Sequence, residues 1–103
     1  MKVLTKSVVF EGQEFVLIKS EHEGRTYYGT IPCTELDDHG CLKRVLTGVD
    51  MRISWENPAE ALENRRRDVV MGRLLDGFKK QGMDTMEAFE AMAQCEEYRQ
   101  LYA

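Results

Sequence analysis

The chain has 103 residues, of which 43% are hydrophobic and 9% aromatic, so it is long enough for one folded domain with one modest core. Its net charge of −4 argues against a protein whose whole surface binds nucleic acid, and its N-terminal residues lack the apolar run of a signal peptide or membrane span. Three cysteines are an odd number without the spacing of a disulfide framework, which predicts reduced thiols and a cytoplasmic location.

The first part of the chain carries three strand signals separated by two turns. Residues 2–10 are rich in β-branched side chains, and residues 25–31 alternate between apolar and polar positions. Residues 14–20 form a short apolar run without strict alternation, which predicts a central strand covered on both faces. Gly12 and Gly24 lie in the two turns, and the first has the glycine that a tight hairpin needs.

A loop and two further strands are predicted between the third strand and the first helix. Residues 32–41 read as a loop, because proline, glycine and acidic residues gather there. Residues 42–46 can form a short strand. Residues 49–55 alternate most regularly, which predicts a half-buried strand. The residues expected to share its buried face are Val49, Met51, Ile53 and Trp55.

A long helix is predicted to begin at Pro58, because Asn57 is a good N-cap and proline suits the first helical position. Two lysines near its end suit the negative end of the helix dipole, and Gly82 is the expected terminator. A helix of about 24 residues spans roughly 36 Å. This length exceeds the width of so small a domain, so the helix is expected either to kink at Gly72 or to project.

A second helix is predicted from an N-cap at Asp84, with Glu87 completing a capping box, to about Tyr102. Its apolar residues form one broad stripe that is expected to face the core: Met86, Ala88, Phe89, Ala91, Met92, Ala93, Cys95, Tyr98 and Tyr102. The connection between the two helices is very short, which predicts an αα-hairpin.

The predicted fold class is α+β. A mostly antiparallel sheet of four or five strands, about 2–56, packs against a C-terminal two-helix hairpin, about 58–102. Both parts belong to a single domain comprising residues 1–103.

Arginine residues give the first predicted helix the strongest local charge of the chain. From residue 58 to 81 six basic and four acidic residues give +2, whereas residues 84–103 carry five acidic and one basic residue, giving −4. The candidate interaction residues of this helix are Arg65, Arg66, Arg67 and Arg73. They could contact phosphates or an acidic partner. Three consecutive arginines spread around a helix and cannot all face one groove, so a solvated helix face is the simpler interpretation.

Cys33, His39 and Cys41 are the other group that could carry chemistry. Their spacing, Cys-x5-His-x-Cys, matches no familiar zinc site. Asp37 and Asp38 beside them could supply a base for a cysteine nucleophile, but acidic turns with glycine are common in loops. The chain has no phosphate-binding glycine loop, nucleophile elbow or H-E-x-x-H sequence. We therefore expect no catalytic residue, no cofactor and no metal.

The C-terminal residues Tyr98, Leu101 and Tyr102 complete the set of candidate interaction residues, because large apolar groups at a fraying end favour a partner surface. The predicted function is that of a small non-enzymatic cytoplasmic protein that binds another protein, with a second copy of the chain, paired through the helices, as one such partner. The alternative is a nucleic-acid-associated accessory protein that uses the basic segment Arg65–Arg67. Salt-sensitive binding to DNA favours the alternative, whereas a salt-indifferent dimer favours the first function.

Overall fold

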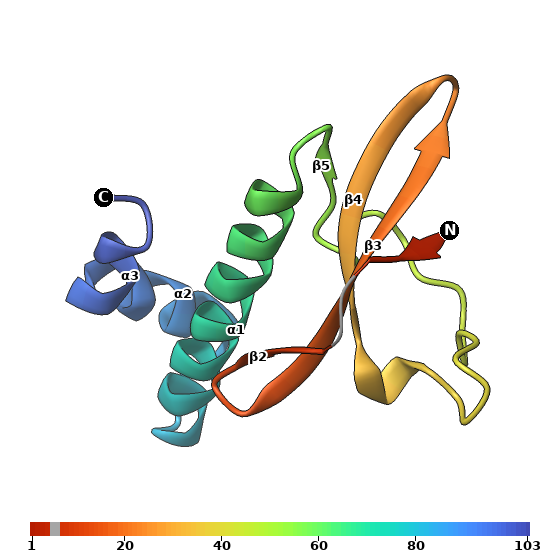
Figure 1. Cartoon of the computed structure of the whole chain (residues 1–103). Coiled ribbons are helices and arrows are strands. Elements are labelled where there is room, and N and C mark those ends of the chain that lie inside the picture. Colours follow the sequence, from red (N-terminus) through yellow and green to blue (C-terminus); the bar gives the residue numbers. More distant parts are fainter. Residues whose placement is uncertain (5–6) are drawn as a thin grey trace. The chain divides into compact units, whose positions relative to one another are not determined.

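The computed structural model describes residues 1–4 and 7–103. It has the predicted α+β architecture, with an antiparallel sheet of five strands in the N-terminal part and helices in the C-terminal part (Figure 1). The chain divides into two compact units, Met1–Arg66 and Arg67–Ala103. The boundary between these units falls inside the first long helix.

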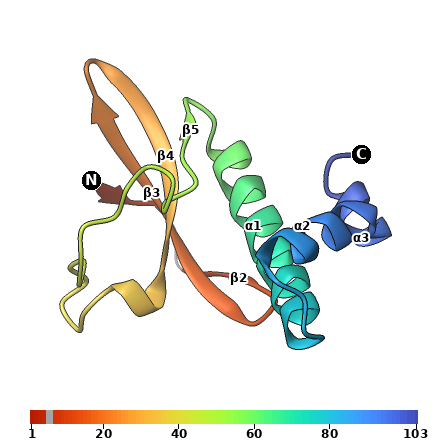
Figure 2. The same cartoon turned by 180° about the vertical axis from the view of Figure 1, so that it is seen from behind.

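The sheet is built on a long hairpin of two strands, β3 (Gln13–His22) and β4 (Arg25–Pro32), which Figures 1 and 2 show from opposite sides. The short strands β1 (Lys2–Val3) and β2 (Val8–Phe10) both pair with β3. On the other side, β5 (Ser54–Trp55) pairs with β4. Two short strands thus replace the single strand expected over residues 2–10.

Residues 5 and 6, which belong to that expected strand, lie outside the described residues. Both tight turns of the sheet use the left-handed backbone region. Glu11 and Gly12 have φ of 48° and 78°, and Glu23 and Gly24 have φ of 50° and 77°. Two successive positive φ angles match the twist that a two-residue hairpin needs, so both predicted turns are confirmed.

Strand β3 is covered on both faces, as its continuous apolar run predicts. Residues 15–18 are all buried. Because side chains alternate along a strand, Val16 and Ile18 lie on one face. They form a core cluster there with Ile31 and Met51. Partly buried side chains complete this core: Tyr27, Cys33, Leu36, Leu42, Leu46 and Ile53.

The segment between β4 and β5 corrects two strand predictions. It begins with the 3-10 helix η1 (Cys33–Glu35). Residues 42–46 form no strand, and Leu42 makes only a single β-bridge with Leu36. The strand predicted over residues 49–55 is limited to the two residues of β5.

A turn around Thr47 and Asp50 explains why the alternating residues do not form a strand. The Asp50 carboxylate accepts a hydrogen bond from the Thr47 amide at 3.0 Å, and the Thr47 hydroxyl accepts one from the Asp50 amide at 3.1 Å. These local bonds compete with strand pairing. Met51 is buried, but Val49 is 71% exposed and Trp55 39% exposed, so the expected shared buried face is wrong.

Helix α1 (Pro58–Lys80) begins and ends where its caps predict. The Asn57 side chain accepts a hydrogen bond from the Glu60 amide at 3.0 Å. Gly82 has φ of 94°, the left-handed conformation that terminates many helices. The helix is uninterrupted through Gly72.

Helix α2 (Thr85–Gln94) begins with the predicted capping box, in which Asp84 and Glu87 each accept a hydrogen bond from the other's amide, at 2.8 and 3.1 Å. The helix ends earlier than expected. Cys95 has extended backbone angles, and a separate helix α3 (Glu96–Gln100) follows. The prediction of one helix to Tyr102 is therefore wrong.

The acidic pair Glu96 and Glu97 suits the start of a new helix after this break. Both carboxylates lie in the first turn of α3, where negative charge suits the positive end of the helix dipole. A new helix can therefore start at this point even though apolar residues continue at helical spacing on both sides of Cys95.

Candidate interaction surface

Arg65, the first residue of the arginine run, is buried inside the N-terminal unit. Its guanidinium donates to the Thr30 hydroxyl at 2.7 Å, to the Thr30 carbonyl at 3.1 Å and to the Asp50 carbonyl at 2.6 Å. The guanidinium also lies over the Phe15 ring, 4.8 Å from its centroid. With only 5% of its surface exposed, Arg65 joins helix, sheet and loop within this unit.

Arg66 is neutralised by a carboxylate of the same helix. Its guanidinium makes two hydrogen bonds with Glu63, three residues earlier. These bonds raise the pKa of Arg66 above its ordinary value. Arg66 is partly exposed, but an anionic ligand would have to compete with Glu63 for its donors.

Arg67 belongs to the C-terminal unit and holds the end of the chain. Its Nε donates to the Leu101 carbonyl at 2.9 Å, and its guanidinium lies 4.8 Å from the centroid of the Tyr102 ring. Tyr98 packs edge-on against Tyr102, with 5.7 Å between ring centroids. Leu101 is buried, Tyr98 is partly buried and Tyr102 is 57% exposed. The three C-terminal candidates are therefore brought together, and Arg67 fastens them to α1.

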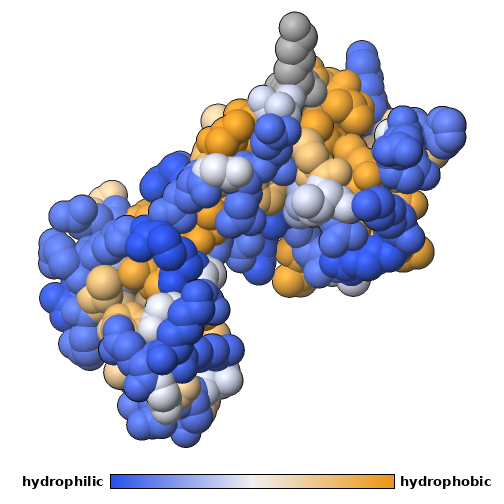
Figure 3. All heavy atoms as spheres, turned by 90° about the horizontal axis from the view of Figure 1, so that it is seen from below, coloured by the Kyte–Doolittle hydropathy of each residue, from blue (hydrophilic) through white to orange (hydrophobic). Residues whose placement is uncertain are grey.

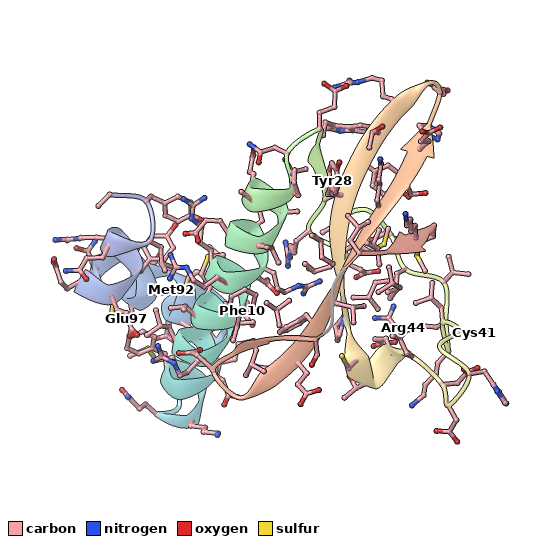
Figure 4. All side chains as sticks on the ribbon, viewed as in Figure 1. Phe10, Tyr28, Cys41, Arg44, Met92 and Glu97 are labelled. Atoms are coloured by element: carbon pink, nitrogen blue, oxygen red, sulfur yellow. The ribbon has the colours of Figure 1, made fainter. Side chains whose placement is uncertain are left out.

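Arg73 makes an ion pair with Glu97 on α3. Glu97 is labelled in Figure 4. The hydrogen bond from Arg73 lowers the pKa of the Glu97 carboxyl. All four candidate arginines thus have partners within their own unit. The sequence predicts where positive charge lies but not that carboxylates, carbonyls and rings of the same chain engage it.

Helix α2 carries an exposed apolar surface whose residues the sequence prediction assigned to the core. Met86 is 68% exposed and Phe89 47% exposed, and Ala93 is exposed as well. These residues, spaced i, i+3 and i+7, share one side of the helix and are called the α2 stripe below. They were expected to widen the core-facing face of the helix, which the structure does not support.

The buried side of α2 consists of other residues. Ala88 and Met92 are buried, and Met92 is labelled on α2 in Figure 4. Helix α2 is therefore apolar on two sides, of which only one lies in the interior. Figure 3 shows, on one face of the molecule, that hydrophobic residues form patches within a largely hydrophilic surface.

A surface hollow of about 590 Å³ lies beside the α2 stripe. This hollow is called the α2 hollow below. Its lining residues are Met83, Glu87, Glu90, Ala91, Ala93 and Gln94. Its small and apolar side chains leave room for a guest side chain, and its two glutamates supply negative charge. Ala93 belongs to both the stripe and the hollow, so the two form one continuous surface.

A second hollow, of about 480 Å³, lies in the N-terminal unit between β3 and η1. Its lining includes Glu14, Phe15, Pro32 and Cys33. Burial and the nearby Glu14 charge raise the pKa of the Cys33 thiol. Because the thiolate is the reactive form, this environment weakens Cys33 as a nucleophile.

The residues weighed as candidate metal ligands in the loop form no metal-binding group in the described part of the chain. Cys33, Cys41 and Cys95 are free thiols, and Figure 4 labels Cys41 on the loop that follows η1. Among residues 1–4 and 7–103, no group of three or more His, Cys, Asp and Glu side chains is placed to hold a metal ion. No helix in the described part of the chain has the length and apolar character needed to cross a membrane.

Comparison with known proteins gives no relative: no protein-family model, characterised protein or solved structure matches the chain.

Proposed function

We propose that this chain is a small non-enzymatic protein-binding module and that the α2 stripe with the α2 hollow is its docking surface. The observation that carries the proposal is the exposure of Met86 and Phe89 on a helix that already buries a different side. Methionine and phenylalanine are both enriched in the cores of protein interfaces. A helix that is apolar on two sides has one side left for a partner.

The two exposed side chains of the α2 stripe can supply only part of the free energy that a specific complex needs. Covering a methionine or a phenylalanine side chain stabilises a complex by about 1.5–3 kcal/mol each. Micromolar affinity corresponds to about 8 kcal/mol, so the two side chains alone do not reach it. The adjoining hollow must contribute further contacts, which makes it part of the proposed surface.

The contacts of the arginine run support a protein partner over nucleic acid. Phosphate binding needs guanidinium groups that reach solvent. Arg65 is buried, and Arg66 is already paired with Glu63. The α2 surface, by contrast, carries two glutamates that would repel a phosphate backbone.

Two further parts of the proposal have separate support. The raised pKa of Cys33 in its hollow argues against this thiol as a catalytic nucleophile, because a thiol held in its neutral form is a poor nucleophile. Three free cysteines support a cytoplasmic location, where thiols remain reduced.

Site-specific photo-crosslinking in the source cells tests the proposal. A photoreactive phenylalanine analogue replaces Met86, and a matched control carries it at Glu21, an exposed residue of β3 in the other unit. We expect discrete protein adducts from position 86 that are lost when Phe89→Ser is added. The proposal is wrong if both positions give the same adducts or if position 86 gives none while circular dichroism shows an intact fold.

Light scattering over a dilution series identifies the case in which the partner is a second copy. A dimer that dissociates on Phe89→Ser assigns the surface to self-association. A monomer at every concentration leaves a different protein as the partner.

A further inference from the structure

The α2 surface combines an apolar stripe with an acidic margin. Glu90 lies one turn after Met86 and one turn before Ala93, so it borders the stripe along its length. Glu87 lines the same hollow as Glu90. The Glu90 carboxylate makes no ion pair with another described residue, whereas the Glu87 carboxylate accepts from the Asp84 amide.

We infer that the occupant of this surface is a basic amphipathic helix, an inference that rests on the proposed function. Its apolar side covers Met86 and Phe89, and a lysine or arginine beside that apolar side enters the α2 hollow. Flexible methionine side chains suit such helix-in-groove binding, because they adapt to different apolar partners.

The lining of the α2 hollow fits a long cationic side chain. Met83, Ala91 and Ala93 offer apolar contact to the methylene stem of a lysine or arginine. Glu87 and Glu90 lie in the same lining and can receive its charged head group. An acidic or neutral side chain in the hollow would leave these carboxylates uncompensated.

The same charges disfavour a second copy of the chain as the occupant. In a two-fold interface, a residue at the axis faces the same residue of the other copy. Pairing of two α2 surfaces would bring their glutamates together, and like charges in contact weaken an interface. The segment from Asp84 to Ala103, with net charge −4, adds to this repulsion.

Binding of three fluorescent model peptides to the full chain tests the inference. The first is an amphipathic helix of leucine and lysine, about 18 residues long so that it can form a stable helix on binding. The second replaces each lysine by glutamate, and the third keeps leucine and lysine in an order with no amphipathic side. Fluorescence anisotropy at low and moderate salt measures the dissociation constants.

We expect the basic amphipathic peptide to bind and the other two to bind at least about tenfold more weakly, because each lacks one of the two required features. Phe89→Ser should weaken the binding of the basic peptide about tenfold. Glu90→Lys should weaken it about fivefold at low salt. The matched charge change Glu21→Lys, at an exposed residue of β3, should leave the affinity for the basic peptide unchanged.

The inference is overturned if the acidic peptide binds as tightly as the basic one, or if Glu90→Lys and Glu21→Lys have equal effects. Absence of binding by all three peptides overturns it as well. Self-association through Phe89 would assign the surface to a second copy and also contradict it. The proposed function survives these results if photo-crosslinking at position 86 still yields a protein adduct, so the two failures are distinguishable.

Discussion

The guanidinium group of Arg65 donates hydrogen bonds to both the side-chain hydroxyl and the main-chain carbonyl of Thr30, thirty-five residues earlier in the chain. A third bond reaches the carbonyl of Asp50. One side chain thus connects the first half of α1, the second half of β4 and the turn before β5. Because both Arg65 and Thr30 are buried, these bonds have little competition from water.

Arg65→Met should lower the free energy of unfolding by roughly 3 kcal/mol. The methionine keeps an apolar stem but removes hydrogen bonds from a charged donor to buried acceptors, each of which contributes about 1.5–3 kcal/mol. Arg66→Met is the matched control on the next residue and should cost at most about 1 kcal/mol, because its partner Glu63 is partly exposed. Urea unfolding followed by circular dichroism measures both. Equal losses in the two variants would contradict the assigned role of Arg65.

Gly29→Ala should destabilise the protein by about 1–3 kcal/mol, the usual cost of overpacking a core. A Cβ atom at this position would lie 3.1 Å from Cγ2 of Ile53 and 3.2 Å from Cβ of Met51. Gly72→Ala in α1 is the opposite case, because a Cβ there meets nothing within 4 Å. Its higher helix propensity should stabilise the protein by up to about 1 kcal/mol. Thermal melts of the two variants should therefore shift in opposite directions.

The turn at Asp50 should weaken on acidification. The pKa of the Asp50 carboxyl lies below its ordinary value of 3.8. The hydrogen bond from the Thr47 amide is the largest cause, the bond from the Thr47 hydroxyl is the second, and the charge of Arg44 adds a smaller effect. A carboxyl whose pKa is lowered by folding contributes stability above its ordinary pKa and loses that contribution as the pH falls through the folded value. Thr47→Val should raise the pKa of Asp50 toward 3.8. NMR titration of the Asp50 carboxyl carbon measures this pKa. An unchanged value in the variant would show that the Thr47 hydroxyl does not lower the pKa, leaving the bond from the amide, which valine retains.

Arg67→Met should loosen the C-terminal helix α3. The lost bond to the Leu101 carbonyl corresponds to about 1.5 kcal/mol, or roughly a tenfold increase in local opening. Amide hydrogen exchange of residues 96–101 measures this increase. Arg99→Ala is the control, because Arg99 is exposed and, among the described contacts, its guanidinium bonds only to the nearby Gln94 side chain. A comparable increase in both variants would show that Arg67 does not fasten the chain end.

Local hydrogen bonds explain the parts of the fold that could be predicted from sequence. Asn57 and Asp84 cap their helices by bonding to amides three residues away, and Gly82 ends α1 through its own backbone freedom. The hairpin of β3 and β4 follows from two apolar strand segments and a two-residue turn. These signals need no distant partner, so the sequence by itself determined the α+β class and the starts of α1 and α2.

Tertiary structure decided which side chains are buried and which reach solvent. The alternation of residues 49–55 predicted a strand, but the bonds between Thr47 and Asp50 turned the chain instead. The charge of the arginine run predicted side chains exposed to solvent. The Arg65 guanidinium instead donates to a buried acceptor, the Thr30 hydroxyl of strand β4. Phe89 belongs to a broad apolar face of α2 that was predicted to be buried, but only part of that face is buried and Phe89 is exposed. The Thr47–Asp50 turn is a local signal that competes with the alternation, and the alternating pattern does not show which of the two prevails. The burial of Arg65 depends on a residue thirty-five positions away, and the exposure of Phe89 depends on which side of α2 is buried, and a one-dimensional pattern contains neither.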